Sequence, residues 1–356
     1  MHCYTPHIPV LIKEVLNYMI HTNTSISNIE DCVFCDATFG AGGHTSALIK
    51  ELSSYKKKGL FLCSDRDEHS IEFFERLHKD TSHSHKMKFF NVKFNNLNEI
   101  LNTTNLYING MMVDLGFSSM QIDSPDRGFS IQNDGPLLMT MGLNDKNASD
   151  ILNSLSTNEL EKILRIYGEE PRAKEIAHSI FRYKQRKKLS TTYELKSIVH
   201  EVYNYKGKYS KIDPATLTFQ ALRIHINQEL YQLMHIILTA ASHIAINGRF
   251  IVITFHGLED IVVKAIFRSI VREQHLPLEN KIISNLNKNI FLLDAISNQK
   301  ELENEIIRST KQYNNSINHK SFYMLNSGNV IKATHKEIKT NRRARSAKIR
   351  ILERIS

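Results

Sequence analysis

The chain has 356 residues, of which 41% are hydrophobic and 23% charged, the balance of a soluble globular protein and not of a disordered one. This length allows one large domain or two of ordinary size, with a sizeable core. No window approaches eighteen consecutive apolar residues and the N-terminus lacks a signal-peptide pattern, so we expect no membrane partner and a cytoplasmic location. The formal net charge of +9 favours a polyanionic partner without identifying it.

Short apolar runs alternate with helical patterns in the first half of the chain, which is typical of a parallel α/β sheet. Strands are predicted at 32–36, 60–64, 87–92, 109–114, 249–254 and 347–352. Helices are predicted at 46–52, 68–78, 97–102, about 228–246 and 258–272. The pattern therefore indicates a Rossmann-like α/β fold.

The interval between Asp114 and Arg249 is too long for a simple crossover. A β-α-β connection needs about 30 residues, and this interval is roughly four times as long. Its content is helical: Ser156-x-x-Glu159 is a capping box before an apolar-periodic run that Gly168 can end. Helices are also predicted at 169–182 and 190–204. We therefore predict an inserted, mostly α-helical domain at 122–215, between two parts of the sheet domain at 1–121 and 216–356.

Two other segments have a less specific composition. Residues 275–340 are polar and rich in Asn and Lys, so we expect a long surface excursion with partial disorder. Cys32 and Cys35 form a C-x-x-C, but no second pair completes a zinc site, and no bound metal is expected. We interpret both cysteines as small buried hydrophobes of a strand.

A glycine-rich loop follows the first strand. Gly40, Gly42 and Gly43 allow a sharp turn and a close approach of the backbone to a ligand, and the next helix begins with unpaired N–H groups. Thr45 stands where the dinucleotide fingerprint G-x-G-x-x-G ends, so a dinucleotide is not favoured. Asp65 ends the second strand, where a carboxylate can accept hydrogen bonds from ribose hydroxyls, although it could equally cap the next helix.

A second candidate loop follows the fourth strand. In an open parallel sheet ligands bind beyond the carboxyl ends of the strands, so Asp114 is expected to face the same crevice as the glycine loop and Asp65. There its carboxylate could accept a hydrogen bond from a substrate amino group or from the cofactor. The alternative is a simple turn, in which Gly116 and Ser118 only allow the bend. These loops predict a nucleotide-type site without separating NAD from S-adenosylmethionine.

Taken together, these segments resemble the ribosomal RNA small subunit methyltransferase H family. The matches cover most of the chain and follow one order. The matching segments are His7-Ile-Pro-Val-Leu-Ile-Lys-Glu14, Asp36-Ala-Thr-Phe-Gly-Ala-Gly-Gly-His44, Asp65-Arg-Asp67, Asp114-Leu-Gly-Phe-Ser-Ser119, Asp126-Arg-Gly-Phe-Ser130, Asp134-Gly-Pro-Leu137, Tyr167-Gly-Glu-Glu170, Pro214-Ala-Thr216, Thr218-Phe-Gln-Ala-Leu-Arg-Ile224, Phe255-His256, Leu258-Glu-Asp260 and Arg343-Ala-Arg-Ser-Ala-Lys348.

The resemblance implies a class I methyltransferase sheet whose inserted domain helps to recognise RNA. It implies S-adenosylmethionine as methyl donor and N4 of a cytidine in the decoding region of 16S rRNA, in the small ribosomal subunit, as acceptor. It also implies cofactor contacts, which by position are Gly42, Gly43, His44, Asp65 (ribose), Phe94, Asp114 and Gln121.

The sequence departs from the family pattern at a few positions. Leu138, Thr140 and Gly142 replace two acids and an arginine, a change that could weaken local order or substrate contacts. Gly257 replaces a usual serine, and Arg342 stands where proline is common. None of these departures removes a residue assigned to the cofactor.

Methyl transfer to a cytosine amino group needs an acceptor for the N4 proton. The N4 lone pair is delocalised into the ring, so a neighbouring acceptor would help to localise it. Asp114 is the first candidate for this role, and the weaker ones are Ser118, Ser119 and His256. A packed or hydrogen-bonded histidine is an equally good interpretation of His256.

Two basic segments could hold the RNA backbone, 182–188 and 342–345, although each could equally be a solvated face. The rival functions fit less well. DNA amino-methyltransferases resemble one another in a [D/N/S]-P-P-[Y/F/W] tetrapeptide, and residues 114–117 lack both prolines, so DNA is not expected as partner. An NAD-dependent oxidoreductase leaves the insertion unexplained, and a purely RNA-binding protein leaves the glycine loop unexplained. The oligomeric state stays open, with a homodimer among the alternatives.

Overall fold

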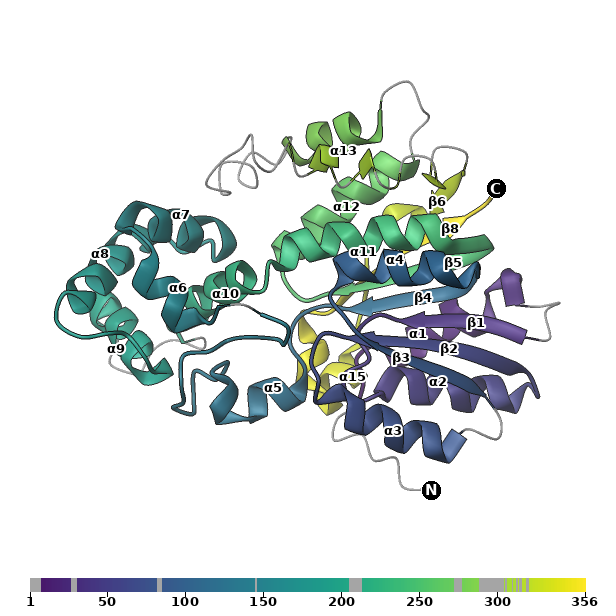
Figure 1. Cartoon of the computed structure of the whole chain (residues 1–356), viewed down its shortest axis with the longest axis horizontal. Coiled ribbons are helices and arrows are strands. Elements are labelled where there is room, and N and C mark those ends of the chain that lie inside the picture. The colour runs from purple at the N-terminus through teal and green to yellow at the C-terminus, as the bar shows by residue number, and fades with distance from the viewer. Residues whose placement is uncertain are drawn as a thin grey trace. The chain divides into compact units, whose positions relative to one another are not determined.

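The computed structural model describes residues 8–26, 31–81, 85–144, 146–204, 213–271, 277–287 and 320–356, with single residues and short pieces between 304 and 317. These residues form two compact units (Figure 1). The sheet unit takes the described residues of Met1–Gly116, Tyr231–Asn285 and Ile306–Ser356, and the helical unit takes those of Phe117–Leu230 and Leu286–Glu305.

In the described chain, eight strands form one sheet with the order β3-β2-β1-β4-β5-β8-β6, and β7 also pairs with β8. The first five strands of this order are parallel, while β8 runs antiparallel to β5, β6 and β7. The bounds are β1 Asp31–Asp36, β2 Lys58–Asp65, β3 Lys86–Asn91, β4 Ile108–Asp114, β5 Ile244–Thr254, β6 Phe322–Met324, β7 Ile331–Lys332 and β8 Lys348–Arg354. The predicted α/β fold with a mostly parallel sheet is confirmed.

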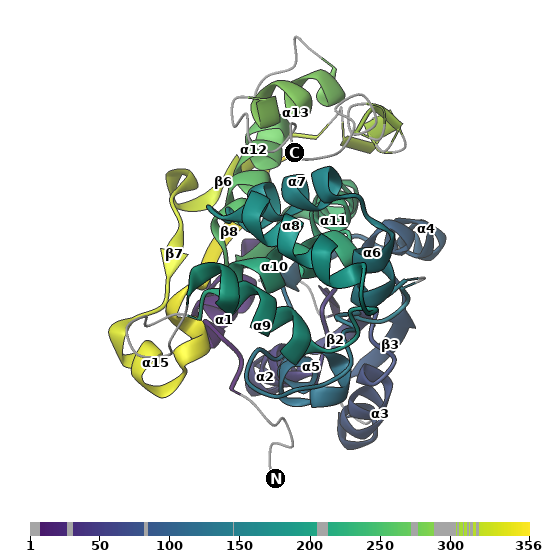
Figure 2. The ribbon, with the colours of Figure 1, turned by 90° about the vertical axis from the view of Figure 1, so that its left-hand side faces the viewer.

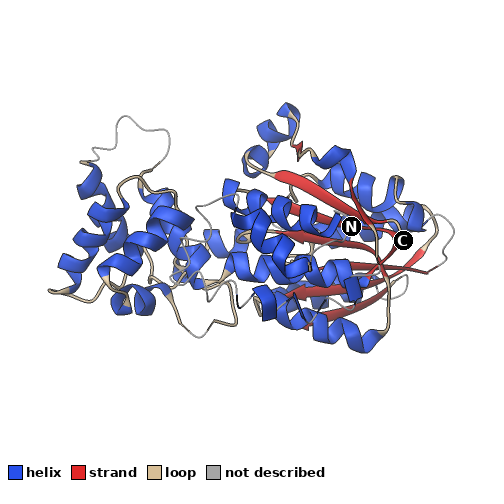
Figure 3. Cartoon of the chain, turned by 90° about the horizontal axis from the view of Figure 1, so that it is seen from above, coloured by secondary structure: helices blue, strands red, loops and turns tan. Residues whose placement is uncertain are grey.

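Helices cover both faces of the sheet (Figures 1 and 3). One face carries α1 (Ile12–Leu16), α2 (Gly43–Ser54) and α3 (Ser70–Thr81), and the other carries α4 (Phe94–Thr104), α11 (Glu229–His243) and α12 (Gly257–Val271). The remaining elements of this unit are the π-helical turn η1 Asn17–His21, the short turns η2 Thr24–Ile26, η4 Leu325–Gly328 and η5 Arg342–Arg345, and the helices α13 Leu278–Asn287 and α15 His335–Thr340. Covered on both faces, the central strands are almost continuously apolar.

The cysteines that the structure describes, Cys32, Cys35 and Cys63, are buried in the sheet without disulfide bonds. Burial raises the pKa of all three thiols. The interpretation of Cys32 and Cys35 as small buried hydrophobes is therefore confirmed.

The helical unit forms an apolar core of its own. Its bounds are α5 Ser119–Asp123, η3 Pro125–Arg127, α6 Ala148–Ser154, α7 Thr157–Tyr167, α8 Ala173–Lys184, α9 Thr192–Tyr203 and α10 Ala215–Ile226. The predicted capping box is confirmed: the Ser156 hydroxyl accepts the Glu159 N–H, the Glu159 carboxylate accepts the Ser156 N–H at 2.9 Å, and Gly168 follows the last residue of α7. Thr191 and Glu194 form a second box at the start of α9.

The helical unit extends beyond the expected limits of the insertion, 122 and 215, on both sides. It includes α10, because Ala215, Phe219 and Leu222 are buried in the same apolar cluster as residues of α7 and α8. The limits of the inserted domain as a functional element remain a prediction.

The interval 275–340 contains more structure than its polar composition suggests. Leu278 and Ile282 are buried one helical turn apart in α13, and Phe322 is buried in β6. The expectation of a surface excursion is wrong for these parts, since a sparse i, i+4 apolar spacing is enough to fix a helix against a core. Residues 288–303 of the interval lie outside the described residues. Within the described residues, no helix combines the length and the apolar character needed to cross a bilayer.

Candidate functional site

Three acidic residues end neighbouring strands at one edge of the sheet. Asp36 is the last residue of β1, Asp65 of β2 and Asp114 of β4. Because β2 and β4 flank β1 in a parallel arrangement, the carboxyl ends of these strands meet where the strand order reverses. Such a reversal is where open α/β sheets bind ligands.

The glycine loop lies across the ends of these strands. The Ala37 N–H donates to the Met112 carbonyl and the Phe39 N–H to the Ser64 carbonyl, both at 3.0 Å. Gly42 has a φ of 77°, and a Cβ there would come within 2.7 Å of the Phe39 ring. A Cβ on Gly43 would come equally close to Pro9, at 2.7 Å. Only glycine fits at these positions, which hold the start of α2 close to the sheet edge.

Asp65 joins the glycine loop to β2. Its Oδ2 accepts the Gly40 N–H at 2.7 Å, and its Oδ1 accepts the Asp67 N–H at 2.8 Å. Burial raises the pKa of Asp65 to about 6, and the two backbone hydrogen bonds oppose this rise. Each carboxylate oxygen keeps a second lone pair, so a turn-capping role and a ligand-binding role are compatible.

Asp114 is the least satisfied carboxylate at this edge. Its N–H donates to the Thr38 hydroxyl at 2.7 Å, and its side chain remains 26% exposed. Its Oδ1 is buried, and no hydrogen-bond partner for it exists among the residues that the structure describes. Burial raises the pKa of Asp114 to about 7; His44 opposes the rise, and Asp36 and Glu259 add to it. A buried acceptor without a partner is costly for the fold, which indicates a ligand-binding role.

His44 lies next to Asp114 at the start of α2. Its Nε2 lies 2.9 Å from the Val10 carbonyl, and its Nδ1 lies 3.9 Å from Asp114 Oδ2. A carbonyl can only accept, so Nε2 carries the proton in this arrangement. The predicted contact of His44 with a cofactor was based on the loop, whereas the structure also places its side chain beside the carboxylate.

Asp36 was not predicted as a site residue. Its Oδ2 accepts the Thr45 hydroxyl at 2.7 Å, and its Oδ1 accepts the Thr38 N–H at 3.1 Å. Burial raises the pKa of Asp36, and His44 and both hydrogen bonds oppose the rise. Thr45, the position that departs from the dinucleotide fingerprint, therefore holds this buried acid. A strand-end acid directly before a glycine loop was the signal that could have identified it.

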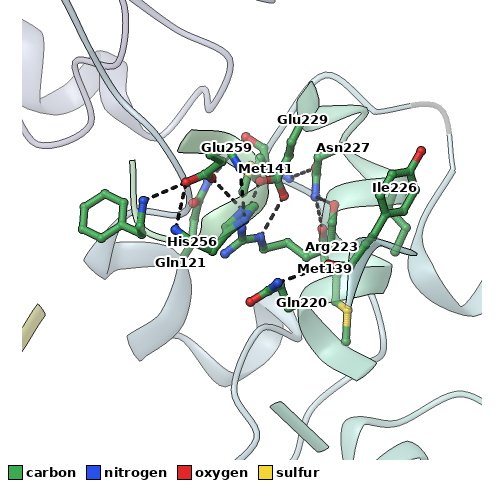
Figure 4. A network of polar contacts seen from close by, with 12 residues as sticks. Gln121, Met139, Met141, Gln220, Arg223, Ile226, Asn227, Glu229, His256 and Glu259 are labelled. Carbon is green, nitrogen blue, oxygen red and sulfur yellow. Dashed lines mark hydrogen bonds and ion pairs between the residues drawn. The ribbon is translucent and has the colours of Figure 1, made fainter. Parts of the chain in front are cut away.

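His256 is already engaged by a neighbouring acid (Figure 4). Its Nε2 lies 2.9 Å from Glu259 Oε1, while Glu259 Oε2 accepts the Phe255 N–H at 2.7 Å. Glu259 is 2% exposed and caps the start of α12. This contact has the distance of an ion pair but not the geometry of a hydrogen bond. Both interpretations of His256, a packed histidine and an acceptor for the N4 proton, therefore remain predictions.

The other predicted positions lie on two different helices. Phe94 is the first residue of α4 and is half-buried in the sheet unit. Ser118 and Gln121 form the capping box of α5 in the helical unit, where Gln121 Oε1 accepts the Ser118 N–H at 2.8 Å. The side chain of Ser119 lies outside what the structure describes. Cofactor contacts of Phe94 and Gln121 remain predictions.

The segment around Leu138, Thr140 and Gly142 is held by its backbone (Figure 4). Asn227 Oδ1 accepts the Met141 N–H at 2.9 Å, and Asn227 Nδ2 donates to the Met139 carbonyl at 2.8 Å. The Thr140 carbonyl accepts a hydrogen bond from Arg127, and Gly142 has a φ of 102°, a conformation that glycine adopts without strain. The departures from the family pattern are therefore compatible with a defined local structure.

The strand reversal, the glycine loop and the strand-end acids define an α/β enzyme of the class that binds a nucleoside-containing cofactor at the carboxyl edge of a Rossmann-like sheet. Comparison with known proteins identifies the family. The model of the MraW methylase family matches residues 4–312.

Three similar proteins carry the name ribosomal RNA small subunit methyltransferase H. The one from Wolbachia pipientis subsp. Culex pipiens (strain wPip) is 37% identical over 98% of this chain and 99% of its own length. That of Caldicellulosiruptor saccharolyticus is 34% identical over the same shares, and that of Ehrlichia canis (strain Jake) is 37% identical over 75% of this chain and 86% of its own. The chain belongs to the MraW methylase family. It is a methyltransferase that uses S-adenosylmethionine as donor.

Proposed function

We propose that this enzyme transfers a methyl group from S-adenosylmethionine to N4 of a cytidine in the decoding region of 16S rRNA, within the small ribosomal subunit in the cytoplasm. The names of its relatives support the rRNA substrate. The observation that carries the chemistry is Asp114, a partly exposed carboxylate with a buried oxygen left without a partner among the described residues. RNA, and not DNA or a membrane, is the expected partner.

The residues of the sheet edge fit the donor. The free lone pairs of Asp65 can accept hydrogen bonds from the two ribose hydroxyls, and the tight turn at Gly42 and Gly43 brings backbone N–H groups of α2 toward the same side. His44 extends this edge, and Phe94 and Gln121 are proposed to complete the pocket. When bound, the donor supplies an electrophilic methyl group on a positively charged sulfur.

The chain itself contributes alignment, exclusion of water and an acceptor for the N4 proton. Asp114 is the group proposed to hold the amino group, because an ionised carboxylate accepts strongly from an N–H donor. Its raised pKa, about 7, also gives the carboxylate enough basicity to take a proton from a developing cation near neutral pH. The target base must leave its stack to reach this position.

The two basic segments differ in how much charge they offer to RNA. In 182–188, Lys184 donates to the Leu152 carbonyl at 2.6 Å, Lys187 pairs with Glu194 at 2.7 Å, and Lys188 lies 3.9 Å from Asp150. Much of this segment therefore stabilises the helical unit.

The C-terminal segment offers more accessible charge. Arg342, Arg343 and Arg345 of the segment 342–345 are exposed, and so are three lysines that precede it, Lys332, Lys336 and Lys339. Glu337 is the one acid between 331 and 348, and its Oε1 accepts the Leu11 N–H. We therefore propose 342–345 as the principal contact with RNA phosphates and the helical unit as a second recognition element.

Methylation of purified small subunits tests this function. Subunits that lack the modification are incubated with the enzyme and radiolabelled S-adenosylmethionine, and the rRNA is digested for nucleoside mass spectrometry. The expected product is N4-methylated cytidine from the decoding region. Label on another atom, on another RNA or on DNA alone would refute the proposal.

A further inference from the structure

The side chain of His44 is held in one orientation by a segment of the chain that lies outside the sheet. The Val10 carbonyl accepts from Nε2, so the opposite nitrogen, Nδ1, faces Asp114 Oδ2 at 3.9 Å. His44 is 6% exposed, which leaves little room for the ring to turn. Without a second proton, two lone pairs would face each other across this gap. The 3.9 Å gap is too long for a hydrogen bond, but a proton on Nδ1 would replace the repulsion between lone pairs by an attraction between opposite charges.

Charged groups around His44 and Asp114 influence whether the Asp114 carboxylate is ionised. Asp36 on β1 and Glu259 on α12 both act on Asp114 as like charges, while His44 on α2 is the group that opposes them. The same histidine also acts on Asp36. Within the described part of the chain, His44 is thus the one basic side chain among the neighbours that influence the pKa values of these acids most strongly.

Resting on the function proposed above, we propose that His44 is the positioning partner of Asp114: protonated at Nδ1, it holds the neighbouring carboxylate in the ionised form that accepts the proton released from cytosine N4. The bond from N4 to the methyl carbon forms as the carbon–sulfur bond breaks, with its electron pair leaving on sulfur. One N4 proton passes to the Asp114 carboxylate, whose partly exposed side chain later releases it to solvent, while His44 keeps its own protons. His44 acts through Asp114 and is a positioning residue.

A contact between the two ends of the chain holds this arrangement. Val10 is followed by Leu11, which is fully buried with a φ of 53° and donates its N–H to Glu337 Oε1 on α15 at 2.6 Å. Asn341 also donates to the Ile8 carbonyl at 2.9 Å. Figure 2 shows α15 beside α1, the helix that follows this segment. The left-handed backbone at Leu11 is strained for a branched residue. The hydrogen bond to Glu337 holds Leu11 in this conformation and so fixes the preceding Val10 carbonyl, which orients His44.

The decisive variant is His44→Gln, whose amide can still donate to Val10 but carries no charge. The acidic limb of the kcat/KM profile for small subunits is expected to move up by about one pH unit, which is about a tenfold loss at neutral pH. Activity should recover at high pH, and calorimetry at each pH separates a change in S-adenosylmethionine affinity from the shift of the acidic limb. His21→Gln is the matched control, because His21 also pairs with a carboxylate, Glu51, at 2.8 Å, and neither residue is assigned to the site. An acidic limb that stays in place in His44→Gln would overturn the proposal.

A second measurement does not depend on turnover. In the unliganded wild-type enzyme labelled with ¹⁵N-histidine, the neutral ring of His44 is expected in the form protonated at Nε2, with Nδ1 unprotonated. Assignment comes from the signal lost in His44→Gln, or in His44→Asn if the first variant is unstable. A neutral ring protonated at Nδ1 contradicts the proposal. Failure of subunit methylation with this tautomer intact would instead count against the proposed substrate alone.

Discussion

The acids at the carboxyl edge of the sheet and Glu194 of the helical unit have pKa values shifted in opposite directions. Asp36, Asp65 and Asp114 have raised pKa values, because burial outweighs the hydrogen bonds they accept. In the helical unit, burial also acts on Glu194, but bonds from Lys187, Ser190 and other neighbours outweigh it and lower its pKa to about 2.

The opposite directions of these pKa shifts have opposite consequences for the stability of the fold. An acid with a lowered pKa stabilises the fold above its unfolded-state pKa and loses this contribution as pH falls through its folded-state value. An acid with a raised pKa destabilises the fold once it ionises, and a ligand can offset that cost. The helical unit therefore uses its acids to stay folded, whereas the sheet unit retains acids that suit a ligand.

The largest expected effect is that of Asp114→Asn. The amide keeps the size of the side chain but cannot take the N4 proton, so kcat should fall by about 10²–10⁴-fold. Binding of S-adenosylmethionine should weaken much less, by roughly tenfold or less, which calorimetry can measure. Retained turnover together with retained binding would remove Asp114 from the mechanism and weaken the contrast between the two units.

Asp65→Asn is expected to affect the binding of S-adenosylmethionine more than the turnover rate. Replacing a charged acceptor by a neutral one should lower the affinity for S-adenosylmethionine by roughly 10–100-fold, with a smaller change in kcat at saturation. In the wild-type enzyme the carboxyl ionises with a pKa of about 6, so affinity should decline as pH falls through this value and level off above it. Titration calorimetry from low to neutral pH checks both points, and a flat profile would show that the ionised form is not required.

Charge reversal in the two basic segments compares the units as RNA-binding surfaces. Replacing Arg342 and Arg345 by Glu should weaken binding to small-subunit RNA by at least about tenfold and reduce the slope of log K against log salt by about two. The matched pair in the other segment, Arg182→Glu and Arg186→Glu, should reduce the slope by about one or less. Filter binding over a range of salt concentrations measures both. Equal slopes for the two variants would contradict the ranking.

The smallest effect on activity is expected from the helical unit's caps. Ser156→Ala removes the acceptor for the Glu159 N–H and should lower the free energy of unfolding by about 1 kcal/mol. Turnover at 25 °C should stay within about twofold of the wild type. Chemical denaturation and the subunit assay measure the two quantities, and Ser154→Ala, next to this helix, serves as control. A large loss of turnover at unchanged stability would assign this helix a direct role.

Local patterns in the sequence predicted the parts of the molecule that local interactions decide. The capping box at Ser156 and Glu159 and the tight turn at the glycine loop depend on residues a few positions apart, and the alternation of apolar runs predicted the strands. The placement of Asp65 and Asp114 at one edge follows from the rule that parallel strands end on the same side.

The tertiary structure decided what depends on distant residues. The antiparallel direction of β8, the orientation of His44 by Val10, and the bond from Leu11 to Glu337 across 326 residues leave no periodic signal in the sequence. The burial of Asp36 and the engagement of Lys187 by Glu194 likewise depend on what packs around them. Residue type and spacing determined which groups could do chemistry, and the fold decided their partners and charge states, because desolvation and pairing act through space and not along the chain.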